Sequence, residues 1–89
     1  MTTEQKELFR RAILNVLSAN PTRHGLPASA IAHHMGMFGF PSPRTDELKD
    51  ELDYLERRDP PLVEQALKVI SKENKAWRIT EAGEAFLDS

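Results

Sequence analysis

The first twenty residues place apolar side chains at helical spacing, with polar ones mostly on the other side. Thr2 and Gln5 have the spacing of a capping box, which favours a helix start at this point. Asn20 and Pro21 favour its end. The pattern therefore predicts an amphipathic helix over residues 4–19. Its expected core side chains are Leu8, Phe9, Ala12, Ile13, Val16 and Leu17.

The stretch PASAIAHHMG predicts a short second helix. Pro27 suits the first turn, and Gly36 suits a left-handed position after the last turn. Ile31 and Met35, four residues apart, are its expected core contacts. The next residues, 37–43, combine Gly, Pro and Phe and therefore predict a loop. Most of its apolar side chains and Met35 are expected to line the core, and an exposed Phe38 or Phe40 would add a hydrophobic anchor to a protein interface.

A third helix is indicated by three leucines. Leu48, Leu52 and Leu55 are spaced four and three apart, which gives one narrow apolar stripe. Asp59-Pro60-Pro61 ends the pattern. With Leu48 at the centre of the buried side and about 100° per residue, the opposite side carries charged residues. They are Asp46, Asp50, Asp53 and Arg57.

The last third of the chain predicts a β-hairpin followed by a helix. Branched and aromatic residues favour strands near 62–70 and 76–80, although a helical first segment also fits its Ala-Leu-Lys centre. Trp77 and Ile79 share one strand face, so Trp77 is expected in the core and not as a base-stacking platform. Thr80 is placed to cap the terminal helix. Its inward side chains are expected to be Ala82, Phe86 and Leu87.

Length and composition set the class of protein. A chain of 89 residues with 39% hydrophobic and 29% charged residues predicts one small folded domain, mainly α with a small β-hairpin (α+β). The chain has no Cys, which excludes disulfides, thiolate catalysis and Cys-based zinc sites and fits a reducing compartment. Its first residues lack the continuous apolar run of a signal peptide or a membrane span. A cytoplasmic protein without membrane contact is expected.

Candidate chemistry for catalysis or metal binding is missing from the sequence. His33 and His34 are adjacent, so on a helix they point about 100° apart and cannot grip one metal together without help from elsewhere. The serines have no surrounding nucleophile signature, and the glycines are scattered singly, so no phosphate-binding loop is indicated. The sequence predicts no enzyme, no catalytic residue, no metal site and no cofactor.

The charges are distributed unevenly along the chain. Residues 46–60 hold seven acids and three bases, residues 21–45 hold two bases and no acid, and residues 61–80 hold four bases and two acids. An acidic third helix therefore lies between basic flanks.

Three phrases of the sequence resemble the winged helix-turn-helix family. GLPASAIAHHMG is similar to its second helix, DELKDELDYLERRDPPLV to its third helix running into the wing, and AWRITEAGEAFL to its second wing strand and closing helix. The resemblance implies three helices, a two-stranded wing and a short C-terminal helix over residues 1–89. Two features depart from the family pattern: the turn from Gly36 to Pro43 is longer, and Asp-Pro-Pro replaces a single Gly after the third helix.

The resemblance implies a binding domain, because the family contains DNA-binding repressors and protein-interaction modules. The first hypothesis is double-stranded DNA binding in transcription control, through the wing and the start of the third helix. Its residues are Arg44, Thr45, Lys49, Lys68, Lys72, Lys75 and Arg78. Alternatively, the lysines only keep a hairpin edge soluble.

The acidic side of the third helix opposes that hypothesis, because DNA phosphates repel it. The alternative hypothesis is a protein-interaction module that docks a basic partner through Asp46, Asp50 and Asp53. A simply solvated charged face is the third interpretation. A DNA binder should present one continuous positive surface, so the arrangement of charges distinguishes the hypotheses. A monomer and a homodimer both remain open.

Overall fold

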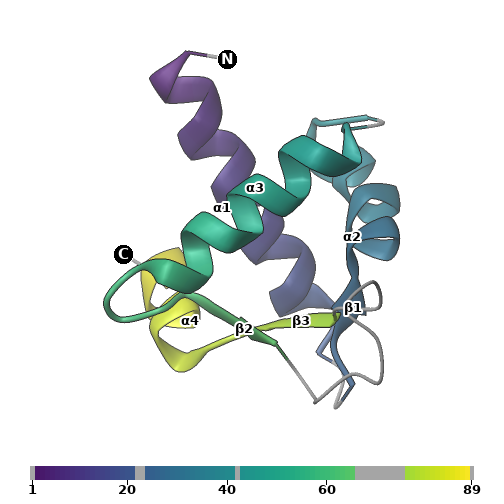
Figure 1. Cartoon of the computed structure of the whole chain (residues 1–89). Coiled ribbons are helices and arrows are strands. Elements are labelled where there is room, and N and C mark those ends of the chain that lie inside the picture. The colour runs from purple at the N-terminus through teal and green to yellow at the C-terminus, as the bar shows by residue number, and fades with distance from the viewer. Residues whose placement is uncertain (1, 22–23, 42, 66–75, 89) are drawn as a thin grey trace.

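The computed structural model describes residues 2–21, 24–41, 43–65 and 76–88. Within these ranges the chain forms helices and short strands, an α+β arrangement (Figure 1). In chain order they are α1 (Thr3–Ala19), β1 (Leu26–Pro27), α2 (Ala28–Met35), the 3₁₀ turn η1 (Gly36–Phe38), α3 (Thr45–Arg57), β2 (Val63–Gln65), β3 (Ala76–Ile79) and α4 (Glu81–Asp88).

The strands form one antiparallel sheet with β3 in the middle, in the order β1-β3-β2. Trp77 of β3 pairs with Leu26 on one side and with Gln65 on the other. The sheet lies at one end of the molecule, and α1 and α3 cross one another beside it (Figure 1). The sequence predicted only the hairpin strands, so β1 is an addition: it is two residues long and depends on the backbone of β3 for its hydrogen bonds.

The core is built from the helices and closed by the sheet. α1 contributes the largest share of the buried side chains, α3 contributes its three leucines, and β3 contributes Trp77. No buried polar or charged residue occurs among the described residues. The buried side chains are Phe9, Ala12, Ile13, Leu14, Val16, Leu17, Ala28, Ile31, Met35, Leu48, Leu52, Leu55, Leu62, Val63 and Trp77.

The first helix confirms the predicted start. The Oγ1 atom of Thr2 accepts from the Gln5 amide at 3.2 Å, and Gln5 Oε1 accepts from the Thr2 amide at 3.0 Å. The core prediction for Leu8 was wrong, because its side chain is 59% exposed, whereas Leu14, which was not expected inside, is buried. The C-terminal half of α1 is enclosed by α2, α4 and β3, while its N-terminal turns extend past α3 (Figure 1).

The prediction for Gly36 was also wrong. Its φ is −58°, a right-handed value, and the chain continues from it into η1. The left-handed position is Gly39, with φ of 93°. The Phe40 amide then donates to the Met35 carbonyl oxygen at 3.1 Å, which closes the turn three residues later than the sequence suggested.

The loop after α2 is only partly a core element. Met35 is fully buried, and Phe40 is half-buried with its ring edge-on to Phe9 at a centroid distance of 5.2 Å. Met37 is 82% exposed and Phe38 is also exposed, in contrast to the prediction that most of this group lines the core.

The hairpin and the last helix follow the predicted order. Trp77 is buried and Ile79, on the same face, packs against the core. The first strand is described over Val63–Gln65, and the predicted part at 66–70 lies outside the described residues. The predicted inward side chains of the last helix pack against the core: Ala82, Phe86 and Leu87.

Candidate functional site

The orientation of α3 is fixed by its leucine stripe. Leu48, Leu52 and Leu55 are each at most 1% exposed, so the opposite side of the helix faces solvent. A second attachment comes from α1: Arg10 Nε donates to Glu51 Oε2, and the Arg10 guanidinium stacks 3.7 Å from the centre of the Tyr54 ring. α3 is therefore held by its core side and by one flank.

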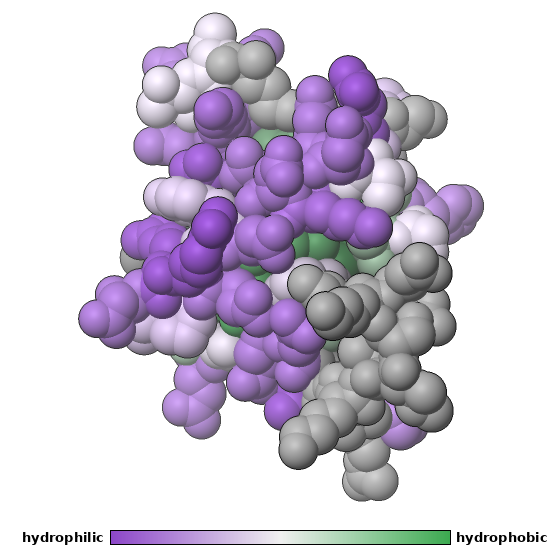
Figure 2. Space-filling view, in the orientation of Figure 1, coloured by the Kyte–Doolittle hydropathy of each residue, from purple (hydrophilic) through white to green (hydrophobic). Residues whose placement is uncertain are grey.

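The exposed side of α3 is acidic, as its spacing predicted. Asp46, Glu47 and Asp50 are exposed, and Asp53 is half-buried. The face of the molecule on which α3 lies in Figure 1 is mostly hydrophilic (Figure 2). This side of α3 therefore presents several carboxylates to solvent and to any binding partner.

The basic residues at the start of α3 are exposed but lie among those acids. Arg44, Thr45 and Lys49 occupy the first turns of the helix and its N-cap. Arg44 Nη2 lies 3.2 Å from Asp46 Oδ2, with side chains 73% and 70% exposed. An ion pair this exposed contributes little to stability. It still places a carboxylate beside the arginine that the DNA hypothesis requires.

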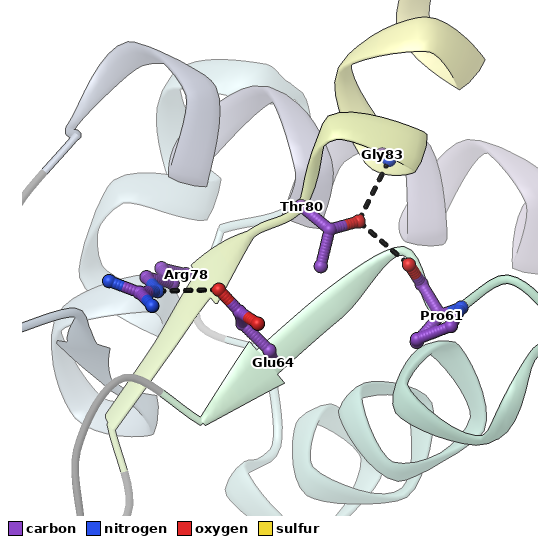
Figure 3. A network of polar contacts seen from close by, with 5 residues as sticks. All are labelled: Pro61, Glu64, Arg78, Thr80 and Gly83. Carbon is purple, nitrogen blue, oxygen red and sulfur yellow. Dashed lines mark hydrogen bonds and ion pairs between the residues drawn. The ribbon is translucent and has the colours of Figure 1, made fainter.

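Arg78 is the described basic residue of the predicted wing. It sits opposite Glu64 in the β2–β3 pair, and its Nε donates to Glu64 Oε1 at 2.7 Å (Figure 3). Its charge is thus offset by a cross-strand partner. The other wing residues of the DNA hypothesis lie outside the described residues: Lys68, Lys72 and Lys75.

The positive side chains at the start of α3 do not form a continuous surface. Arg44, Thr45 and Lys49 come together at one end of α3, but acids interrupt them. The described surface therefore lacks the continuous positive area that DNA binding would use.

A polar network connects the sheet with α4 (Figure 3). The Thr80 hydroxyl donates to the Pro61 carbonyl oxygen at 2.7 Å and accepts from the Gly83 amide at 3.0 Å. This confirms the predicted cap of the last helix. The Thr80 amide also donates to the Leu62 carbonyl oxygen at 3.1 Å, so the start of α4 is tied to the segment that follows α3.

A groove that the sequence did not reveal lies between α1, α3 and α4. Its volume is about 740 Å³, and its apolar lining includes Leu8, Tyr54 and Phe86. Its charged lining residues are Glu4, Glu7, Arg10, Arg11 and Arg58. One sequence pattern could have indicated this groove. On α1 a second line of residues is offset from the buried side of the helix: Glu4, Glu7, Leu8 and Arg11.

A second, smaller groove of about 320 Å³ lies on the other side of Leu8 and Arg11, where α1 meets Phe38 and Phe40. Leu8 therefore lines both grooves.

Neither a candidate metal site nor a membrane-spanning helix occurs within the described ranges. They contain no group of three or more His, Cys, Asp or Glu side chains able to hold a metal ion, and the rings of His33 and His34 have centroids 5.7 Å apart. None of the helices described is both long and apolar enough to cross a bilayer.

Comparisons of the chain with protein-family models, with curated proteins and with solved structures gave no match.

Proposed function

We propose that this chain is a winged-helix domain that acts by binding and not by catalysis. The order α1-β1-α2-α3-β2-β3-α4 supports this proposal, with a β2–β3 hairpin extended by β1 and with the hairpin following the third helix. In this interpretation α3 corresponds to the helix that faces the ligand, and residues 66–75 belong to the wing.

The binding partner of the α3 surface is a basic protein. The observation that carries this proposal is the exposed side of α3, where Asp46 and Asp50 face solvent while the leucines hold the helix from behind. If α3 entered the major groove of DNA, this side would meet phosphates at about one negative charge per 1.7 Å of the DNA axis, and the carboxylates would be repelled. Toward a basic protein the same charges steer encounter and exclude acidic competitors.

DNA binding through the wing is the second candidate function. It is favoured by the sequence of the β2–β3 connection, where Lys68, Lys72 and Lys75 accompany a single acid, Glu73. Phosphate contacts from such a segment need no entry of α3 into the groove. The pairing of Arg78 with Glu64 weakens this candidate, because the adjoining base is already offset.

One titration distinguishes the two functions. The amide NMR spectrum of the labelled protein is recorded with a lysine-rich peptide and, separately, with a mixed-sequence DNA duplex, each at low and raised salt. The proposal expects peptide-induced shifts at Asp46, Asp50 and Asp53. The triple variant D46N/D50N/D53N should lose these shifts, and E81Q/E84Q, which removes acids from α4, is the matched control.

The spectra recorded with the DNA duplex test the second candidate function and can contradict the first. Salt-sensitive shifts at Arg44, Thr45 and Lys49 would overturn the proposal, because α3 would then contact DNA directly. Salt-sensitive shifts confined to residues 66–78 would support DNA binding by the wing.

A further inference from the structure

One side of α1 is only partly covered by the described fold. Glu4, Glu7, Leu8 and Arg11 follow one another at intervals of three, one and three residues, so they form one stripe on this side of the helix. All four line the groove between α1, α3 and α4. Leu8 at the centre is 59% exposed. The stripe has carboxylates at its N-terminal end, a leucine in the middle and a guanidinium at its C-terminal end.

The apolar surface extends to both sides of this stripe. Leu8 shares the larger groove with Tyr54 and the smaller one with Phe38. These three residues are among the four large apolar side chains that are exposed in the described part of the chain. An apolar centre rich in aromatic residues, with a charged rim, is the usual composition of a protein interface.

The charged rim determines the kind of partner. Arg11 Nη2 donates to the Leu87 carbonyl oxygen at 3.0 Å, which holds the guanidinium at the edge of the groove and uses one of its five N–H donors. Arg58 lies over the Phe86 ring at 5.4 Å on the α4 side. Because the rim carries both signs, a uniformly acidic or basic partner would complement only half of it.

A second α1 helix running in the opposite direction complements both halves. In an antiparallel pair centred between Glu7 and Leu8, Glu4 of one copy faces Arg11 of the other, and the same contact recurs by symmetry. The two residues are seven positions apart, or about 10.5 Å along the axis, so both contacts form within two helical turns. Leu8 and Glu7 lie equally close to the twofold axis in this register, so each Leu8 packs beside Leu8 of the other copy and the two Glu7 side chains meet on the other flank.

We propose that this surface is the interface of a homodimer with twofold symmetry, formed by antiparallel pairing of α1 around Leu8. Asp46 and Asp50 do not line the groove, although Tyr54, one turn after Asp50, does. Dimer formation is therefore measured without any partner, which keeps its failure distinct from a failure to bind a basic partner.

The test is sedimentation velocity of the full chain over a concentration series, without any partner. The wild type should pass from monomer to dimer as concentration rises. L8E should weaken dimerisation by at least about tenfold, since it places a charge in the apolar centre. M37E is the matched control, because Met37 is 82% exposed and lines neither groove, and it should dimerise like the wild type.

Charge reversal tests the antiparallel register itself. E4R alone brings two arginines together at each contact, and R11E alone brings two glutamates together, so each variant should remain monomeric. An equimolar mixture should form a heterodimer, because both contacts again join opposite charges. Circular dichroism checks the fold of each variant, and if R11E does not fold, L8E and E4R decide the question.

A wild type that remains monomeric throughout the series would overturn the proposal. So would a dimer that persists in L8E and E4R, which would locate the interface elsewhere, or a groove occupied by a heterologous protein in place of a second copy.

Discussion

The hydroxyl of Thr80 donates a 2.7 Å hydrogen bond to the carbonyl oxygen of Pro61, 19 residues earlier in the chain. The same oxygen accepts from the Gly83 amide. One side chain therefore caps α4 and ties it to the segment that leaves α3.

Replacing Thr80 should separate packing from hydrogen bonding. T80V keeps the shape of the side chain but removes both bonds, so we expect the free energy of unfolding to fall by about 2 kcal/mol. T80S keeps the hydroxyl and should lose less than about 1 kcal/mol. Urea unfolding followed by circular dichroism measures both. Equal losses in the two variants would contradict a role for the hydroxyl.

Gly83 should not tolerate a side chain. A Cβ atom there would lie 2.3 Å from the Leu62 carbonyl oxygen and 2.6 Å from Ile79 Cγ1. We expect G83A to lower the free energy of unfolding by about 3 kcal/mol, because the backbone must shift to relieve the overlap.

Gly36 provides the control for that substitution. Its φ is −58°. A Cβ atom added to Gly36 would have Pro41 Cα as its nearest neighbour, at 3.9 Å, which is an ordinary van der Waals contact. G36A should leave stability unchanged or raise it by about 0.5 kcal/mol. If both glycine variants unfold at the same urea concentration, the close approach of α4 to Leu62 is incorrect.

The Arg10–Glu51 pair should couple more strongly than the pair at the start of α3. Its side chains are 22% and 15% exposed, and it joins α1 to α3. A double-mutant cycle with R10A and E51A should give a coupling energy of about 1 to 2 kcal/mol. The same cycle on the exposed pair Arg44–Asp46 should give less than about 0.5 kcal/mol. Similar coupling energies for the two pairs would contradict the expectation that the more buried pair couples more strongly.

Two methionines that are two residues apart should respond differently to truncation. Met35 is fully buried, so M35A should cost about 3 kcal/mol in unfolding free energy. Met37 is 82% exposed, so M37A should change it by less than about 0.5 kcal/mol. Thermal or urea unfolding of both variants checks this. A large loss from M37A would mean that the loop packs inward.

The helices could be predicted because their signals are local. The Thr2–Gln5 box and the spacing of Leu48, Leu52 and Leu55 act within a few residues, and the structure confirms both. β1 was missed because Leu26–Pro27 has no alternation of its own and pairs with a strand about fifty residues away.

The candidate surfaces could be predicted only in part, because the sequence pattern shows what lies within one helix but not which distant segments come together. The acidic side of α3 follows from one helix, so its position was predicted, whereas its role remains a prediction. The groove brings together Leu8, Tyr54 and Phe86 from three separated segments. Periodicity alone assigned Leu8 to the core, but Leu8 lies about 100° around the helix from the buried Phe9, so its side chain faces the groove.

The central position of β3 also determines when the sheet can assemble. β1 and β2 are not paired with each other, and each depends on β3 for its hydrogen-bonded neighbour. Synthesis proceeds from the N-terminus, so α1, α2 and α3 leave the ribosome before the strand that joins the sheet. A nascent chain stalled before Ala76 would therefore carry α1, α2 and α3 but expose two unpaired strands, each open to mispairing with other chains.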